Sequence, residues 1–466
     1  MKSGRLPALV ILGVLLAVAG CGGGGDDGGD GGDGGDQSIT FWSAEDVAER
    51  VKATQDIAAA FQQKTGIQVK VVAIAEDQLA TQIQSASAGG TLPDVMGALS
   101  LGFVHNLATD DLADTDAANE VIESLGRDTF SERAISLVEA DGKPVAVPSD
   151  TWTQLLVYRK DLFEKAGLET PDSFDKILAA ATKLKEPGRN GIVAATKAAD
   201  GFTQQTFEYF ALANGCQLTD DQGAIQLTTP QCVETFKFYG DLISGGSSKG
   251  GQDADTTRAS YFAAKSAMII WSSFLLDELA GLRNDALPTC AECREDKAFL
   301  AENSGVVTAI TGPSGSEPTQ FGEVTSFAII KDGNTDPAKQ FVEYMMSEGY
   351  ADWLALAPEG KFPTRSGTAD NPEEYNEAWS KLQAGVDEKK PLSELYPPEV
   401  LDALTKSTDT MNRWGFQQGQ GALVGAQLAE LPIPKAVAAE LDGQLTPDAA
   451  AKQAQADVEE IAESIK

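Results

Sequence analysis

Residues 38–96 read SITFWSAEDVAERVKATQDIAAAFQQKTGIQVKVVAIAEDQLATQIQSASAGGTLPDVM, and this stretch decides the fold class. Residues 39–42 and 67–74 are rich in β-branched and aromatic residues, which is typical of strands, and residues 92–96 open a third strand. Apolar residues recur at helical spacing before Gly66 and again before Gly89, so a helix follows each of the first two strands. Three such units within about 60 residues predict a parallel sheet wrapped by helices.

The alternation of strands and helices continues beyond this stretch, with more helix. Further strands are predicted at residues 145–147, 154–158, 267–271 and 324–330. Further helices are predicted over residues 173–185, where Ser173 is the candidate cap, 203–213 and 231–243. Beyond about residue 335 the pattern is helical almost to the end, with prolines interrupting it. No repeat of fixed period occurs, which argues against a solenoid.

The charge balance argues against several functions. The 466 residues include 36 Lys and Arg but 70 Asp and Glu, for a net charge of −34. Binding to nucleic-acid phosphates needs clustered Lys and Arg, so we expect no nucleic-acid partner. The chain has a single histidine, His105, through which any histidine-dependent catalysis would have to run. It lies in a helix-like apolar stretch, and we expect it to be a packing or surface residue.

The N-terminus has the plan of an export signal. Lys2 and Arg5 precede an apolar run over residues 8–20, which predicts a secretory signal peptide at residues 1–20. The run ends as Val-Ala-Gly-Cys at residues 18–21, which resembles the bacterial lipobox, so Cys21 is the predicted lipid-modified residue. Residues 22–36 contain only glycine and aspartate and cannot form a core, so residues 21–37 are predicted to be a flexible linker. The folded part should therefore lie outside the cytoplasmic membrane, anchored to it, whether in a periplasm or at the cell surface.

Four more cysteines remain, and an even number in an exported chain suggests disulfides, with three possible connectivities. Proximity in the sequence favours Cys216 with Cys232 and Cys290 with Cys293. The second pair is a C-x-x-C, but it lies in a loop-like stretch without the strand–helix context of a redox site. A zinc site would need two more good ligands, and a second C-x-x-C is absent. We expect no metal and no cofactor.

Short motifs follow one another in a fixed order along most of the chain. The most informative are GKPVAVP at 142–148 and LVYRKDLFEKAGL at 156–168. The others are ITFW at 39–42, FQQKTGIQV at 61–69, AGGTLPDV at 88–95, FAAKSAM at 262–268, GEVTSFAI at 322–329 and LDGQLTPDAA at 441–450. In this order and spacing they resemble the extracellular solute-binding proteins of ABC importers, in particular the carbohydrate-binding group that includes maltose-binding protein. Arg159 departs from the pattern, which has asparagine at this position.

This resemblance implies a two-lobed α/β fold of the Venus-flytrap type. Each lobe would hold a mainly parallel sheet flanked by helices, followed by a helical C-terminal part. By analogy, residues 38–148 and about 310–355 form the first lobe, and residues 149–309 and about 356–466 form the second. Several crossings of the chain between the lobes would give a hinge that bends as the lobes close. We expect a monomer.

The resemblance also indicates where a sugar would bind. A sugar offers C–H faces that stack on aromatic rings and hydroxyl groups that bond carboxylates, amides and arginines. Ligands in open α/β sheets collect beyond the carboxyl ends of strands. That rule and the family positions together indicate a set of candidate ligand-binding residues, Trp42, Glu45, Asp77, Ser100, Asp150, Trp152, Trp271, Glu323 and Arg365.

The favoured hypothesis is a lipid-anchored receptor that captures a sugar, of di- or oligosaccharide size, and delivers it to the permease subunits of an ABC transporter. Such a receptor is not an enzyme. One alternative is a receptor for a non-sugar solute, such as a polyamine, a peptide or an anion. Another is an exported glycoside hydrolase, which could work with two carboxylates and no histidine.

Overall fold

A computed structural model of the chain describes residues 38–465, so the predicted signal peptide, Cys21 and the linker over 21–37 lie outside the described residues. The strands of its main sheet are β1 (Ser38–Ser43), β2 (Gln68–Ala73), β3 (Val95–Leu99), β6 (Val147–Arg159), β7 (Met268–Ser272), β8 (Ser304–Val307), β9 (Gln320–Ile329), β10 (Phe362–Pro363) and β13 (Met411–Asn412). Their order is β10-β6-β9-β3-β1-β2, with β7 and β8 paired to β6 and β13 paired to β9.

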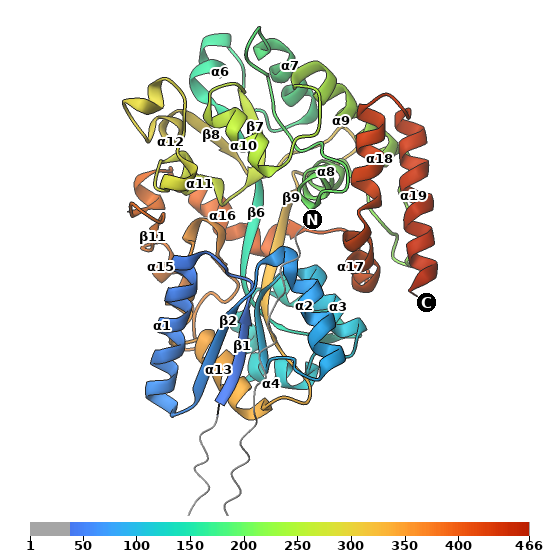
Figure 1. The fold of residues 1–466 in the computed structure, drawn as a ribbon. Helices are drawn as coiled ribbons and strands as arrows, with labels where there is room; N and C mark the ends of the chain where they lie inside the picture. The colour runs from blue at the N-terminus through green and yellow to red at the C-terminus, as the bar shows by residue number, and fades with distance from the viewer. Residues whose placement is uncertain (1–37, 466) are drawn as a thin grey trace, which may run out of the picture. The chain divides into compact units, whose positions relative to one another are not determined.

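Helices cover this sheet in two groups (Figure 1). The group beside β1, β2 and β3 comprises α1 (Ala48–Thr65), α2 (Glu76–Gly89), α3 (Leu101–Thr109), α4 (Thr115–Leu125), α5 (Glu132–Leu137), α13 (Thr335–Met345) and α14 (Tyr350–Leu354). The group beside β7 and β8 comprises α6 (Lys160–Ala166), α7 (Phe174–Leu184), α8 (Gly201–Ala213), α9 (Pro230–Gly246), α10 (Ala254–Phe262), α11 (Leu275–Leu279) and α12 (Phe299–Asn303). We call the two groups, each with its strands, the first and the second lobe.

The first three strand–helix units form as predicted. Strand β1 pairs in parallel with β2 on one side and with β3 on the other. Helix α1 ends at Gly66, which has a φ of 80° and donates its N–H to the carbonyl of Gln62. A positive φ carries little steric penalty in glycine, so Gly66 ends the helix and lets the chain turn back into β2.

Strand β6 differs from its prediction, because one strand of 13 residues replaces two short ones. No strand is predicted in its polar middle, yet Ser149, Asp150, Thr151 and Thr153 are buried there. Ser149 Oγ donates to the carbonyl of Thr325 at 3.0 Å, and Thr153 Oγ1 to that of Phe321 at 2.6 Å. One end of β6 pairs with β9 in the first lobe and the other with β7 and β8 in the second, so this strand joins the lobes (Figure 1).

The two-lobed α/β fold is confirmed, but the sheet is mixed rather than mainly parallel. Strands β3 and β6 both pair with β9 in antiparallel fashion, and β7 and β8 pair antiparallel with β6. The parallel order holds among β1, β2 and β3 because helices link them, whereas β9 returns from the second lobe in the opposite direction. Ser173 is also not a side-chain cap; helix α7 follows it, and the N–H of Phe174 donates to the carbonyl of Thr311 instead.

The C-terminal part is mostly helical, as predicted, and contacts both lobes. Its helices are α15 (Glu374–Trp379), α16 (Pro398–Thr410), α17 (Gly421–Glu430), α18 (Pro432–Leu441) and α19 (Pro447–Ser464). Helix α17 packs against α3 of the first lobe, whereas α18 and α19 pack against α9 of the second. Within residues 38–465, no helix has both the length and the apolar character needed to cross a bilayer.

Both disulfides favoured by sequence proximity are present, Cys216–Cys232 and Cys290–Cys293. The first spans 16 residues and ties the turn after α8 to the start of α9. The second spans three residues in the loop before α12. The first bond should stabilise the second lobe more, since a longer closed loop restricts the unfolded chain more strongly.

Replacing Cys216 and Cys232 together by serine should lower the free energy of unfolding by about 3 kcal/mol. The matched double replacement of Cys290 and Cys293 should cost about 2 kcal/mol, because it opens a much shorter loop. Urea unfolding followed by circular dichroism measures both values. A larger loss for the short loop than for the long one would contradict this assignment.

Candidate ligand-binding cleft

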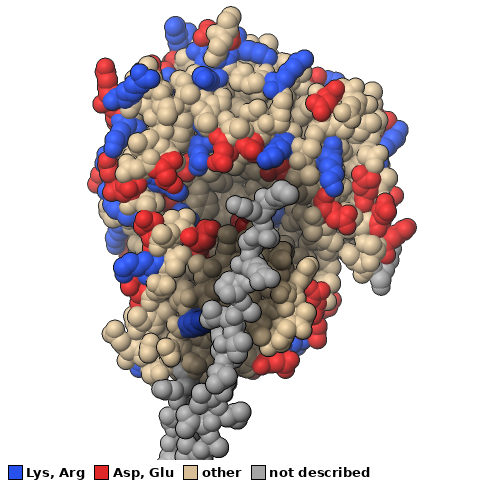
Figure 2. Space-filling model, viewed as in Figure 1, with Lys and Arg blue, Asp and Glu red and all other residues tan. Residues whose placement is uncertain are grey.

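A cavity of about 770 Å³ lies between the two lobes. The first lobe contributes the segments that follow β1, β2 and β3, and the second contributes β7, the start of α8 and the residues around Phe274. Figure 2 shows the hollow between the upper and lower parts of this face, with acidic and basic side chains mixed around its rim. The cavity therefore lies beyond the carboxyl ends of the parallel strands, where ligands of open α/β sheets collect.

Most of the predicted site residues line this cavity. They come from separate parts of the chain and both lobes: Glu45, Asp77, Ser100, Asp150, Trp152, Trp271 and Glu323. Strands β6 and β9, which cross between the lobes, carry three of these residues, Asp150, Trp152 and Glu323. Trp152 of β6 lies opposite Glu323 of β9 where the two strands pair. The fold brings these residues together, and their contact with a ligand stays a prediction.

Two predicted residues lie elsewhere. Trp42 is half-buried on β1 and packs against the hydrophobic core. Arg365 is 3% exposed, and its guanidinium donates to the carbonyls of Leu125 and Met346 and to Thr129 Oγ1. These bonds tie the segment after β10 to the end of α4, so Arg365 holds the first lobe together and does not face the cavity.

The second lobe provides an aromatic wall. Trp152, Phe202, Trp271 and Phe274 all line the cavity. The ring centroids of Phe202 and Trp271 are 6.0 Å apart, and the Arg258 guanidinium lies 5.6 Å from the Trp271 ring. Trp271 Nε1 donates to the carbonyl of Ala254 at 3.1 Å, so the polar atom of this indole is already bonded and its orientation is fixed. Phe202 and Phe274 were missed because no motif or strand end marks them.

A buried ion-pair network forms the base of the cavity. Lys361 Nζ lies 2.7 Å from Glu45 Oε1 and 3.2 Å from Asp150 Oδ1. Arg50 Nη1 approaches Glu45 Oε2 at 3.1 Å, and Trp353 Nε1 donates to Asp150 at 2.8 Å. Burial alone would raise the pKa of Glu45, but Lys361 and Arg50 outweigh it and lower the pKa to about 2. Glu45 is therefore ionised and paired at neutral pH.

A second network joins the lobes, and its Arg413 and Glu323 also line the cavity. Arg413 is 3% exposed and lies between Glu208 of α8 and Glu323 of β9. Its Nε is 3.0 Å from Glu208 Oε1, and Nη1 donates to Glu323 Oε2. Desolvation would lower the pKa of Arg413, but the two carboxylates raise it overall. The other oxygen of Glu323 accepts the N–H of Leu101 at the start of α3, so one carboxylate links three elements.

Comparison with known families decides the identity of the fold. Residues 44–352 match the family of bacterial extracellular solute-binding proteins. The chain belongs to this family. The match covers most of the chain and includes both crossing strands and the segments that follow β1, β2 and β3.

Individual relatives of this solute-binding protein agree with the family. The chain is 27% identical over 334 residues to the putative ABC transporter periplasmic-binding protein YcjN of Escherichia coli, covering 70% of this chain and 73% of the relative. The GacH receptor of Streptomyces glaucescens, solved unliganded and with acarbose, has a TM-score of 0.69, 19% identity and coverage of 92% and 99%. The cyclic α-maltosyl-1,6-maltose binding protein of Arthrobacter globiformis has the same score and identity, with coverage of 92% and 100%.

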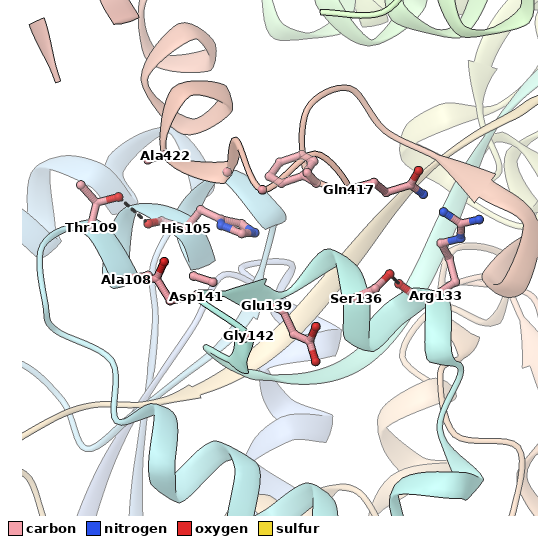
Figure 3. A pocket seen from close by; sticks show the side chains of 14 residues that line it. His105, Ala108, Thr109, Arg133, Ser136, Glu139, Asp141, Gly142, Gln417 and Ala422 are labelled. Atoms are coloured by element: carbon pink, nitrogen blue, oxygen red, sulfur yellow. Dashed lines mark hydrogen bonds between the residues drawn. The ribbon is translucent and has the colours of Figure 1, made fainter. Parts of the chain in front are cut away.

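This solute-binding protein has a second cavity, of about 610 Å³, beside its only histidine (Figure 3). His105 is buried, its Nε2 lies 2.9 Å from the carbonyl of Leu137, and its ring centroid is 4.9 Å from that of Phe416. Burial lowers the pKa of His105, so the imidazole is neutral at pH 7. His105 is a packing residue, and within residues 38–465 no group of three or more acidic, histidine or cysteine side chains is placed to hold a metal.

Proposed function

We propose that this solute-binding protein captures a sugar of di- or oligosaccharide size between its lobes and delivers it to the permease subunits of an ABC transporter. The cavity carries this proposal, because it opposes aromatic side chains of the second lobe to carboxylates of the first. Sugar C–H faces stack on aromatic rings, and sugar hydroxyls donate to carboxylates. The oligosaccharides bound by the GacH receptor and the Arthrobacter globiformis protein support it.

Capture would work by a shift between open and closed states. A ligand that contacts both lobes at once favours the state in which they approach each other, and β6 and β9 are the hinge strands. The proposed lobes are residues 38–148 with about 310–355, and 149–309 with about 356–466. Arg365 and α17 contact the first lobe. We therefore propose that residues 356–366 and α17 move with the first lobe when the lobes close.

We further propose that Cys21 carries a lipid anchor, which would hold the protein at the outer face of the cell membrane, and that the protein is a monomer. The family is extracellular, which supports the location. Mass spectrometry of the mature N-terminus tests the anchor: a diacylglycerol on Cys21 supports it, and an unmodified cysteine or cleavage elsewhere contradicts it.

We infer that the protein binds without catalysis. A glycoside hydrolase needs one carboxyl group that is protonated at neutral pH and can donate its proton. In this cleft Glu45 has a pKa of about 2, and the buried cations Lys361 and Arg413 pair with Glu45, Asp150 and Glu323. Such pairing suits a rigid binding surface, since it holds the three acidic side chains in place. Burial raises the pKa of Glu76, which also lines the cleft and would be the acid of a hydrolase, so recovery of the sugar unchanged is the test of this inference.

Intrinsic tryptophan fluorescence tests this function, because Trp152 and Trp271 line the cavity. The panel should contain mono-, di- and oligosaccharides and sugar alcohols, with spermidine and a short peptide for the alternative that the solute is not a sugar. We expect saturable changes with at least one sugar, which is recovered unchanged. Binding of spermidine or peptide alone would overturn sugar capture, and release of monosaccharide over many turnovers would establish a hydrolase.

A further inference from the structure

We propose that the cleft selects its solute by charge: it accepts neutral sugars and sugars with a protonated amine, and it rejects the same sugars when they carry a phosphate or a carboxylate. This inference rests on the proposed sugar capture and concerns the same cavity. It follows from the way in which the charged side chains of the cavity are paired.

The cations of the cavity are already engaged. Among the described residues, the cationic side chains that line it are Arg50, Lys361 and Arg413. Lys361, 1% exposed, is shared between two carboxylates, and Arg413, 3% exposed, is held between two others. Arg50 pairs with Glu45 through Nη1 and lies 3.9 Å from Glu359 through Nη2, and its buried Nε has no hydrogen-bond partner among the described residues. Recognition of a phosphate or carboxylate normally uses a free Arg or Lys, and withdrawing one of these cations would leave a buried carboxylate unpaired.

The anions of the cavity are in excess. Asp46, Glu76 and Asp77 line the cavity from the first lobe, and no cation of residues 38–465 lies within ion-pair distance of them. Desolvation raises the pKa of Glu76, and the charges of Glu323, Glu45, Asp46 and Asp77 raise it further. Added negative charge is therefore unfavourable in this part of the cleft, whereas a positive charge would be stabilised.

Helix N-termini, the other usual sites for anions, also carry carboxylates here. The first turn of α2 holds Glu76 and Asp77 themselves. The N–H of Leu101 at the start of α3 donates to Glu323, and Asp200 accepts the N–H of Thr203 at the start of α8. An incoming anion would have to displace these groups or lie beside them, so the dipoles of these helices do not create an anion site.

Calorimetric titration of the purified mature protein at pH 6.5 and low salt tests the charge selection. The neutral probes are glucose, maltose and cellobiose, the cationic probes are glucosamine and the chitosan disaccharide, and the anionic probes are glucose 6-phosphate, maltose 1-phosphate and digalacturonate. We expect each anionic probe to bind at least about tenfold more weakly than the tightest neutral or cationic probe, because like charges repel in a partly desolvated cleft. An anionic probe that binds as tightly would overturn the inference and leave sugar capture standing.

A variant protein tests the assigned residues. The double replacement Asp46→Asn with Glu76→Gln keeps Asp77 and should reduce the affinity gap between neutral and anionic probes severalfold. In the wild type, 0.5 M NaCl should also reduce this gap, because salt screens the charges. Glu460→Gln on the exposed face of α19 is the matched control and should leave the gap unchanged. An unchanged gap in the double variant would contradict the role of these carboxylates. Failure of every probe, of whatever charge, would instead reject sugar capture itself.

Discussion

Replacing Trp152 by alanine is expected to weaken sugar binding by roughly 2–3 kcal/mol, a loss of about 30- to 150-fold in affinity. Trp152 lies on the strand that joins the lobes, lines the cavity and is half-buried. Its ring is tilted against Phe321 with 6.1 Å between centroids, so a packed neighbour holds it in place. Alanine removes the aromatic face without removing any of the ion pairs at the base of the cavity.

Trp152→Phe is the matched control, because a smaller ring keeps an aromatic face at the same position. It should lose only part of the affinity, while the free energy of unfolding shows that both variants fold. Trp271 is a less clear test, since its indole also bonds Ala254 and packs under Arg258. Equal affinities for the alanine variant and the wild type would show that Trp152 does not contact the ligand.

The second large effect concerns stability. Replacing Arg413 by methionine should lower the free energy of unfolding by about 3–5 kcal/mol, because it leaves Glu208 and Glu323 buried without their shared cation. Methionine keeps the length and apolar contacts of the arginine stem. Urea unfolding at pH 7 measures the change.

Lys52→Met provides the comparison for Arg413. Lys52 pairs with Asp56 on the surface of α1, and both side chains are exposed. Surface pairs of this kind contribute about 0–1 kcal/mol, so this variant should unfold almost as the wild type does. A loss below about 1 kcal/mol for Arg413→Met would mean that the two glutamates relax to water, contrary to the buried network described above.

Much of the fold could be predicted because local sequence patterns determine it. The units over residues 38–99 carry β-branched strands, apolar helix faces and glycine stops, and each signal is local. The polar middle of β6 carries no such signal. Ser149 and Thr153 are stable inside the sheet only because β9, far away in the sequence, supplies carbonyl acceptors.

The lining of the cavity could be predicted in part for the same reason, and contact of these residues with a ligand stays a prediction. Residues at strand ends and motif positions, such as Glu45 and Trp271, line the cavity. Arg365 follows a turn that resembles a cleft position, but the carbonyls at the end of α4 occupy its guanidinium. Asp46 and Glu76 lie beside predicted residues and were missed because only the folded chain shows which of the 70 carboxylates face the cleft.

Sugar capture between the lobes is tested most directly by isothermal titration calorimetry of the mature protein with a series of neutral di- and oligosaccharides. We expect one sugar bound per protein, with saturable heat, a negative heat-capacity change and an affinity about 30- to 150-fold weaker in Trp152→Ala. If the protein shows native circular dichroism and yet none of these sugars produces binding heat at any temperature, the cavity does not hold a sugar.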